Sequence, residues 1–303
     1  MSDNKALIGH LTALFTIFVW GTTFVATKVL LVDFTPIEIL FIRFILGFIA
    51  LTLAYPHRLK LTDSSQRLYF ILAGIFGITL YFLLENIALT YTLIANVGIL
   101  VTASPFFTAI LSYLFATGEK LHKRFFLGFL IAIAGICLIM FNGNIVLNLN
   151  PLGDLLALGA ALAWSLYSIC MQKISTFSYN TVQVTRVTFM YGLIFMLPAL
   201  FIFDVSSDIV RFYKPINIFN FLFLGLGASA LCFATWNFAI KTIGTLKTSV
   251  YIYLVPVIAV ITASILLDEP LPLLSILGIL LTILGLIISE DRLQFLYKYT
   301  HKK

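Results

Sequence analysis

Few charged side chains lie inside the long apolar stretches of this sequence, and these few could do chemistry there. Arg43 falls in the second apolar stretch, Glu85 in the third and Lys28 in the first. Burial favours a protonated carboxylic acid, whereas a nearby arginine favours the carboxylate, so an acid in this setting can take up or release a proton as its exposure changes. Arg43, Glu85 and Lys28 are therefore candidates for gating or coupling. The alternatives are a structural Arg43–Glu85 ion pair and a lysine that reaches toward the membrane surface.

A second group of polar and aromatic side chains could line a cavity and contact a solute. Aromatic residues in membrane helices are more often packing residues or interface anchors, but Trp20 and Trp164 lie near the middle of their stretches. Arg186 has no acid beside it, because Trp236 occupies the position that corresponds to Glu85. It could bind backbone carbonyls at a helix end or an anionic group of a substrate. The candidates are Trp20, Tyr81, Asn86, Asn96, Trp164, Tyr167, Arg186, Asn237 and Tyr251.

Several kinds of chemistry have no counterpart in the sequence. The histidines fall in loops or at the ends of spans, so no histidine pair is expected inside the membrane, and no Gly-rich phosphate loop or serine–histidine arrangement is present. Cys137, Cys170 and Cys232 occur singly, without the spacing of a metal site. We therefore predict no metal, no cofactor and no catalytic residue, and we expect that the protein is not an enzyme. The net charge is +6, but the basic residues are dispersed, which argues against nucleic acid as a partner.

The elements that must position these residues are membrane-spanning helices. Of the 303 residues, 61% are hydrophobic and only 11% are charged, far from the composition of a soluble domain. Apolar runs and their breakers predict an all-α integral membrane protein with ten spans. The spans are predicted at about residues 7–32, 36–55, 67–89, 92–117, 123–141, 152–174, 180–203, 216–241, 244–268 and 270–289.

The distribution of basic residues predicts the orientation. With the N-terminus inside, the inner segments hold fourteen Lys and Arg residues, and the outer loops hold only Arg211 and Lys214. Because basic loops stay on the cytoplasmic side, both termini are predicted to be cytoplasmic. The expected location is the plasma (inner) membrane, with residues 290–303 as a basic cytoplasmic tail.

The chain also repeats itself. Trp20 and Trp164 are 144 residues apart, Arg43 and Arg186 are 143 apart, and Asn86 and Asn237 are 151 apart. Pro105 and Pro256, also 151 apart, lie in the middle of the fourth and ninth spans, where they are predicted to bend the helix. The repeats are predicted at 1–141 and 152–289, with an external linker at 142–151. Five spans per repeat, an odd number, predict that the second copy is inverted.

These features together resemble one family, the EamA-type permeases of the drug/metabolite transporter superfamily. The resemblance covers residues 6–290 and rests on Trp20-Gly21, Pro105, Pro256, residues 251–257 (YIYLVPV) and Glu269-Pro270. It implies a plasma-membrane carrier with a central cavity lined by helices of both halves. Two departures, Trp164-Ser165 instead of Trp-Gly and Lys120 instead of a proline after Glu119, indicate that the halves have diverged in detail.

The function predicted from the sequence is secondary transport by alternating access. The carrier is expected to export small metabolites, such as amino acids or related amphipathic compounds, with proton coupling as an option. Its expected partners are a small-molecule substrate and the lipid bilayer. The first alternative is an accessory or lipid-handling membrane protein without small-solute transport, and a membrane enzyme is third. Substrate, direction, coupling ion and a homodimeric state stay open.

Overall fold

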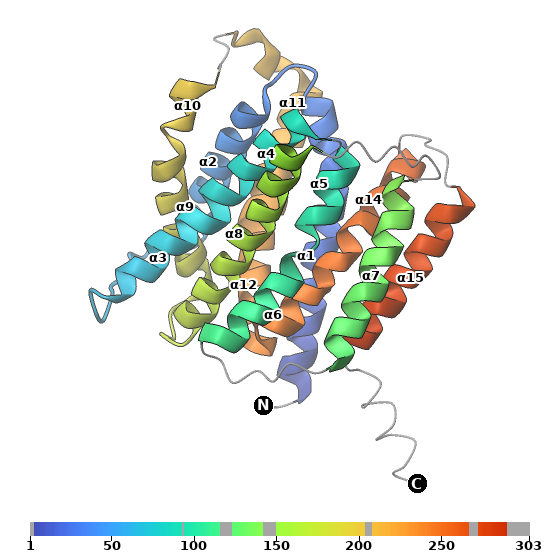
Figure 1. Cartoon of the computed structure of the whole chain (residues 1–303). Helices are drawn as coiled ribbons and strands as arrows, with labels where there is room; N and C mark the ends of the chain where they lie inside the picture. The colour runs from blue at the N-terminus through green and yellow to red at the C-terminus, as the bar shows by residue number, and fades with distance from the viewer. Residues whose placement is uncertain are drawn as a thin grey trace.

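The computed structural model describes residues 3–92, 94–115, 123–141, 150–203, 208–266 and 272–289. Within these ranges all regular structure is helical, and the helices form one bundle (Figure 1). Several features of the sequence lie outside the described residues: Glu119, the linker residues 142–149, Glu269-Pro270 and the tail 290–303.

The first half of the chain forms five spans. Its third span contains a π-helical segment, and its fourth span is interrupted by two irregular residues, Thr102 and Ala103. The elements are α1 (Asp3–Leu30), α2 (Pro36–Ala54), α3 (Gln66–Gly74), η1 (Ile75–Leu80), α4 (Tyr81–Tyr91), α5 (Ile94–Val101), α6 (Ser104–Phe115) and α7 (Lys123–Phe141).

The second half forms the other five spans and contains additional short segments. The elements are α8 (Pro151–Ser175), α9 (Thr181–Met196), α10 (Ala199–Ile202), η2 (Val210–Tyr213), α11 (Pro215–Leu222), η3 (Phe223–Leu231), α12 (Cys232–Ile243), α13 (Thr245–Ser249), η4 (Val250–Tyr253), α14 (Leu254–Leu266) and α15 (Leu273–Ser289). As in the first half, the third span of the repeat contains a π-helical segment, η3.

The helices confirm the predicted fold class. In the described part of the chain, nine helices are long and apolar enough to cross a membrane, and Leu273–Ser289 is a shorter apolar helix at the position of the tenth span. The predicted span limits agree with the helix limits to within a few residues. The largest difference is at the start of the first span, which is predicted from residue 7 and begins with α1 at Asp3.

The packing of the helices follows a two-fold relation between the halves. Helix α1 packs on α12 and α14, and its counterpart α8 packs on α4 and α6. Helix α2 contacts η3, and its counterpart α9 contacts η1. Two further pairs, α2 with α9 and α7 with α15, each join a helix to its own counterpart. These contacts are related in pairs between the halves, as expected for two copies of one unit, whereas α3 packs on α8 and α9 more extensively than its counterpart α11 packs on α1 and α2.

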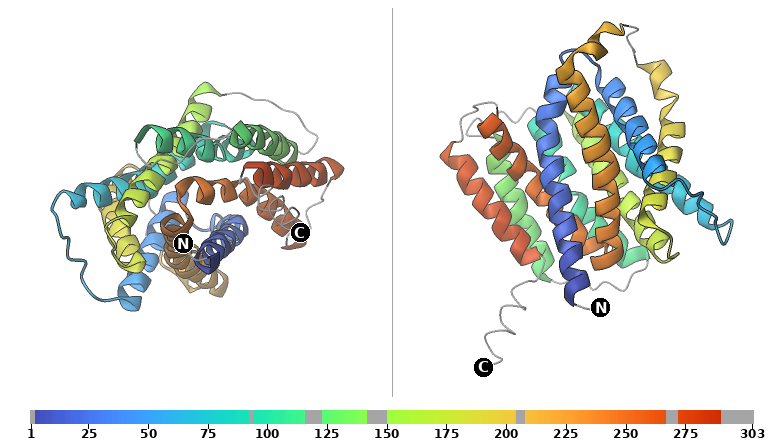
Figure 2. Two further views of the ribbon diagram at one scale, coloured as in Figure 1. Left: turned by 90° about the horizontal axis from the view of Figure 1, so that it is seen from below. Right: turned by 180° about the vertical axis from the view of Figure 1, so that it is seen from behind.

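The copies run in opposite directions. Helix α1 begins at the lower end of the bundle in Figure 1, whereas its counterpart α8 begins at the upper end. Figures 1 and 2 also show α7 and α15 side by side at one edge of the bundle, running antiparallel. We call the end where α1 begins the predicted cytoplasmic end, and the opposite end the predicted outer end.

The fourth span is interrupted just before Pro105, whereas the ninth span stays helical and changes from a 3₁₀ segment, η4, to α-helix just before Pro256. Pro105 is the second residue of α6, which follows the irregular residues Thr102 and Ala103, and Pro256 is the third residue of α14. The first turn of a helix needs no intrahelical partner for its N–H groups, so a proline is well accommodated there. The carbonyl of Ser104 at this break accepts a hydrogen bond of 2.8 Å from Ser165 Oγ in α8.

The orientation is testable by cysteine labelling. In a background without the three native cysteines, single cysteines at Asn144 and Ser207 are expected to react with a membrane-impermeant maleimide in intact cells. Cysteines at Ser64 and Ser175 are expected to react only after permeabilisation, because basic residues flank them. Labelling of the second pair alone in intact cells would show the opposite orientation.

Candidate functional site

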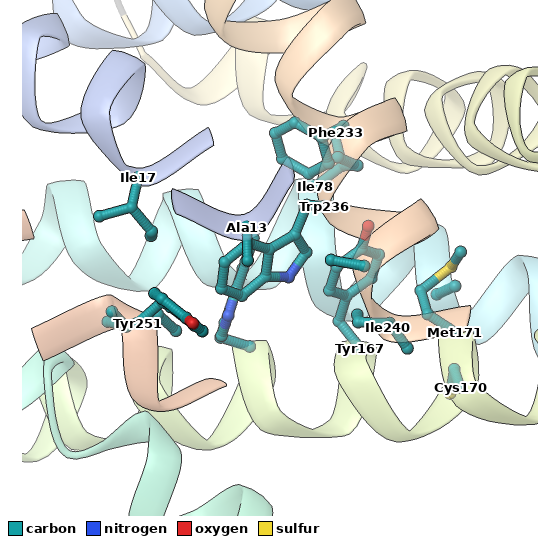
Figure 3. Packing of buried hydrophobic residues seen from close by; sticks show 14 of the residues in the cluster. Ala13, Ile17, Ile78, Tyr167, Cys170, Met171, Phe233, Trp236, Ile240 and Tyr251 are labelled. Atoms are coloured by element: carbon teal, nitrogen blue, oxygen red, sulfur yellow. The ribbon is translucent and has the colours of Figure 1, made fainter. Parts of the chain in front are cut away.

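Aromatic rings from both halves meet in the middle of the bundle. Trp20 of α1 lies 5.5 Å from Trp164 of α8 and 5.2 Å from Trp236 of α12, between ring centroids. Tyr81 of α4 lies 5.1 Å from Trp164. Figure 3 shows the surroundings of the Trp236 ring, with Tyr167 on one side and Tyr251 on the other. We name as the central aromatic cluster Trp20, Tyr81, Trp164, Tyr167, Phe233 and Trp236.

The structure thus brings together four of the predicted cavity residues: Trp20, Tyr81, Trp164 and Tyr167. A fifth, Tyr251, is 4% exposed and belongs to the same buried core as Trp164, and its hydroxyl lies 2.9 Å from His10 Nδ1. Sequence reasoning did not select Trp236 and Phe233. Their spacing of three residues, which places both on one face of α12, was a signal that could have indicated them.

The three tryptophans of the cluster differ in their hydrogen bonding. Trp20 Nε1 donates to the carbonyl of Ala228, in the π-helical segment η3, at 2.9 Å. The indole N–H groups of Trp164 and Trp236 are buried and have no hydrogen-bond partner. Buried donors are normally paired, so these two mark the cluster as unusual.

Asn237, another predicted site residue, lies beside the cluster in a buried polar chain. The Tyr167 hydroxyl donates to Asn237 Oδ1 at 2.6 Å, and Asn237 Nδ2 donates to Thr185 Oγ1 of α9 at 3.0 Å. Asn237 therefore holds the Tyr167 ring in place and connects α8, α9 and α12. Because these hydrogen bonds join Asn237 to other side chains of the protein, they give Asn237 a positioning role.

Glu85 is connected to the cluster through Tyr81. The Tyr81 hydroxyl donates to Glu85 Oε1 at 3.2 Å, one helical turn further along α4. No Arg43–Glu85 ion pair within 4.0 Å forms among the described side chains, so the direct pair considered from the sequence is absent. Instead, Arg43 Nε donates to Ser229 Oγ at 3.0 Å, and its guanidinium lies over the ring of Phe82 at 5.6 Å.

Arg186 binds backbone carbonyls, which is one of the two roles considered from the sequence. Its guanidinium donates to the carbonyls of Tyr55 and His57, both at 2.7 Å. Tyr55 is the C-cap of α2, so the arginine satisfies carbonyls that follow the end of that helix. This position at the predicted cytoplasmic end separates Arg186 from the central aromatic cluster.

The other predicted residues lie outside the cluster. Asn96 is buried and donates to Thr92 Oγ1 at 3.0 Å, and Thr92 Oγ1 donates to Asp154 Oδ1 at 3.0 Å, which joins the third, fourth and sixth spans. Asn86 is partly buried in α4, and Lys28 is exposed in the last turn of α1. Neither Asn86 nor Lys28 belongs to the central aromatic cluster, so a functional role for either residue stays a prediction.

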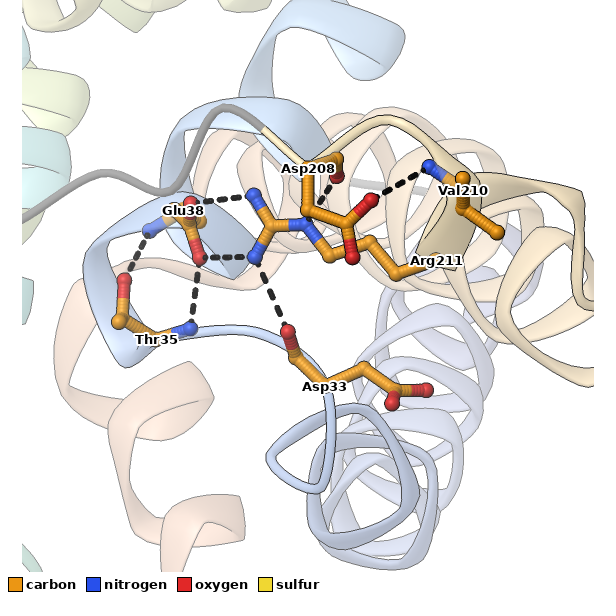
Figure 4. A network of polar contacts seen from close by, with 6 residues as sticks. All are labelled: Asp33, Thr35, Glu38, Asp208, Val210 and Arg211. Atoms are coloured by element: carbon orange, nitrogen blue, oxygen red, sulfur yellow. Dashed lines mark hydrogen bonds and ion pairs between the residues drawn. The ribbon is translucent and has the colours of Figure 1, made fainter.

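A network that the sequence analysis missed joins the halves at the predicted outer end (Figure 4). Arg211 of η2 binds Glu38 of α2 through two hydrogen bonds of 2.6 and 3.0 Å, and the side chains are 8% and 3% exposed. Arg211 also donates to the carbonyls of Asp33 and Asp208. We name as the outer clamp Asp33, Glu38, Arg211, Lys214 and Asn217.

The clamp contains a second, more exposed part around Asp33. Hydrogen bonds from Asn217 and Lys214 lower the pKa of Asp33, and hydrogen bonding to Glu38 raises the pKa of Arg211. Because the pKa of Asp33 is lowered by folding, its contribution to stability is present above the ordinary pKa of aspartate and is lost as the pH falls through the lowered value. Glu38 also accepts from the Thr35 N–H and completes a capping box, a pattern readable in the sequence.

A cavity of about 400 Å³ lies between α3 and α9, at the predicted cytoplasmic end. Its walls are mostly apolar and include Phe70 and Met190, with Arg67 at its edge. None of its lining residues belongs to the central aromatic cluster. In the described ranges, no group of three or more His, Cys, Asp or Glu side chains could hold a metal ion.

The match to a known protein family divides the chain into the same two parts. The EamA-like transporter family matches residues 7–141 and 151–289. A probable amino-acid metabolite efflux pump of Escherichia coli is 27% identical over 286 residues, which cover 91% of this chain and 93% of that protein. An uncharacterized transporter of Archaeoglobus fulgidus is 25% identical over 287 residues, covering 93% of this chain and 97% of that protein.

A solved structure shows the same fold. One crystal structure superposes with a TM-score of 0.78 at 20% identity, covering 95% of this chain and 98% of that chain. At this identity the likeness concerns the fold alone. The matched residues, the helical bundle and the named relatives together show that this chain is a membrane protein that belongs to the EamA-like transporter family.

Proposed function

We propose that the protein is a secondary carrier that exports small amphipathic metabolites, amino acids or related compounds, by alternating access. The observation that carries the proposal is the central aromatic cluster, which takes rings from both inverted halves. A site between inverted repeats is exposed to one side of the membrane and then to the other as the halves rock. The Escherichia coli relative, named as a probable amino-acid metabolite efflux pump, supports the choice of solute class.

The rings of the central aromatic cluster can separate when the two halves move apart, because they belong to different repeats. Trp20 and Tyr81 belong to the first repeat, whereas Trp164, Phe233 and Trp236 belong to the second. Contacts at 5.1–5.5 Å between ring centroids across this boundary describe a closed centre. The irregular residues before Pro105 and the 3₁₀ segment η4 before Pro256 provide points at which the fourth and ninth spans can change direction.

Purified protein in liposomes tests the function directly. Liposomes loaded with one labelled amino acid from a panel are expected to lose it by counterflow when unlabelled solute is added outside. The solute is expected to be recovered unchanged, which separates a carrier from an enzyme. Absence of exchange for every aliphatic and aromatic member of the panel, with protein that remains folded in the liposomes, would contradict the proposal.

Glu85 is the proposed coupling residue, and its replacement makes a specific prediction. The change Glu85→Gln removes the ionisable group but keeps an acceptor for the Tyr81 hydroxyl. We expect it to abolish transport driven by a pH gradient while solute binding remains measurable. The measurement is uptake into liposomes with and without an imposed gradient. Transport at the parental rate with the same pH dependence would assign Glu85 a structural role.

A further inference from the structure

The strongest unexplained feature of the molecule is the pair of buried indole N–H groups of Trp164 and Trp236. The two side chains come from different helices, α8 and α12, and are 5% and 0% exposed. Neither N–H has a hydrogen-bond partner. The two donors are neighbours, with 6.2 Å between their ring centroids. A buried donor without an acceptor is destabilising, and two adjacent ones add their costs.

The repeat shows that this arrangement is not a general consequence of the fold. Trp20 occupies the position in the first copy that Trp164 occupies in the second, and Trp20 Nε1 donates to the Ala228 carbonyl. The counterpart of Ala228 in the other half is Gly77. The Tyr167 ring packs directly on Gly77, so closely that a Cβ added there would lie 2.3 Å from Tyr167 Cδ2. The second copy thus places a phenol ring beside the equivalent backbone, and Trp164 Nε1 is left without an acceptor.

Trp236 also departs from the repeat. It stands at the position that corresponds to Glu85, so one copy has an acceptor and the other a donor at this place. The Tyr167 hydroxyl donates to Asn237 Oδ1 and accepts from neither indole N–H. A guanidinium lies one ring outside the cluster: Arg43 is 5.5 Å from the Phe44 centroid, and Phe44 is 5.8 Å from Phe233. Two donors and a nearby cation form a setting that suits a negatively polarised group.

We infer that Trp164 and Trp236 form a donor pair that binds the carboxylate or carbonyl oxygen of the transported solute. The inference rests on the proposed function, since a solute reaches these rings only when the halves move apart. The apolar part of the solute would pack on the surrounding rings, and its acceptor oxygen would take both N–H groups. The site therefore selects compounds that carry an acceptor next to an apolar body, and it disfavours amines that lack one.

The competing explanation is that the two N–H groups point at aromatic faces of the cluster. Such N–H···π contacts are weak, but they would account for the missing acceptors without a ligand. The two explanations differ in what a ligand does. A donor pair makes binding depend on the acceptor of the ligand and on the N–H of each tryptophan, whereas N–H···π contacts make it depend on neither.

The test uses three probes with the same phenylpropyl body: 3-phenylpropionate, 3-phenylpropanamide and 3-phenylpropylamine. Binding to the purified full-length protein is measured by calorimetry. The isosteric changes Trp164→benzothienylalanine and Trp236→benzothienylalanine replace only the N–H by sulfur. We expect the acid and the amide to bind the parent protein, and each variant to bind them about tenfold more weakly. The amine is expected to bind weakly to all three proteins.

The matched control is Trp20→benzothienylalanine, in which the N–H donates to Ala228. This change is expected to lower thermal stability, whereas Tyr113→Phe, at an exposed residue of α6, is expected to leave the affinity for the acid unchanged. Parental affinity in both test variants, equal binding of the amine, or no binding of the acid or the amide would each overturn the inference. Loss of binding in the variants together with an absence of transport in liposomes would instead contradict the proposed function and keep the donor pair.

Discussion

Replacing Arg211 with alanine is expected to lower the free energy of unfolding by about 3–5 kcal/mol. The reason is that the change leaves Glu38, which is 3% exposed, as a buried carboxylate without its cation. Two hydrogen bonds to Glu38 and those to the carbonyls of Asp33 and Asp208 are lost at the same time. The measurement is chemical denaturation of the purified protein in detergent, with thermal unfolding as a second readout.

The outer clamp offers a matched control three residues further along the chain. Lys214 also binds an acid, at 2.6 Å from Asp33 Oδ1, but the lysine side chain is 53% exposed. Exposed pairs contribute about 0–1 kcal/mol, so Lys214→Ala is expected to change stability far less. Adding Glu38→Gln to Arg211→Ala removes the unpaired charge and is expected to restore much of the loss. Equal stability of the two single alanine variants would contradict the buried pair.

The clamp also bears on how the halves can move. Asp33 and Glu38 belong to the first half, and Arg211, Lys214 and Asn217 belong to the second. Any opening at the predicted outer end that separates α2 from η2 must break the Arg211–Glu38 pair. At the other end, Arg186 of the second half binds the carbonyls after α2 of the first half. The halves are thus joined on both sides of the membrane by one buried arginine each.

Much of the fold was predictable because a bilayer leaves few options. Each span must satisfy its own backbone hydrogen bonds, so apolar runs of sufficient length become helices. The repeat added tertiary information: Trp20 and Trp164 were paired by position in the sequence, and the structure places their rings 5.5 Å apart. Tyr81 and Tyr167 were predicted as aromatic residues that could form a cavity wall, without a pairing by the repeat.

The missing parts depend on contacts that repetition and hydropathy do not encode. The Arg211–Glu38 pair joins residues 173 positions apart through a loop and a helix start, and the position that corresponds to Glu38 in the other half holds Thr181. Arg43 and Glu85 were considered as an ion pair, but hydropathy does not give the rotation of each helix. The structure directs Arg43 toward Ser229 and Glu85 toward Tyr81. The unpartnered N–H of Trp236 depends on what surrounds it, which no sequence pattern reports.

The glycines of the fifth and tenth spans make the second large prediction. Gly128 and Gly135 in α7 face Gly285 and Gly278 in α15, and a Cβ added at Gly285 would lie 2.4 Å from the Ala132 nitrogen. At Gly135 it would lie 2.6 Å from the Gly278 carbonyl oxygen. These neighbours are backbone atoms, so the two helices would have to separate to admit a side chain. Close approach of this kind is how small residues hold helices together in lipid.

We therefore expect Gly135→Leu and Gly285→Leu each to lower stability by at least about 1–3 kcal/mol, the usual cost of an overpacked core. Alanine at either position is expected to act in the same direction, because the first added atom already meets the backbone. The matched control is Gly159→Ala in α8, where the added Cβ would be 3.4 Å from Leu84 Cδ1, an ordinary contact. Solute preference should be unchanged in every folded variant, because the central aromatic cluster lies on other helices. Leucine variants as stable as the parent would mean that α7 and α15 do not pack through these glycines.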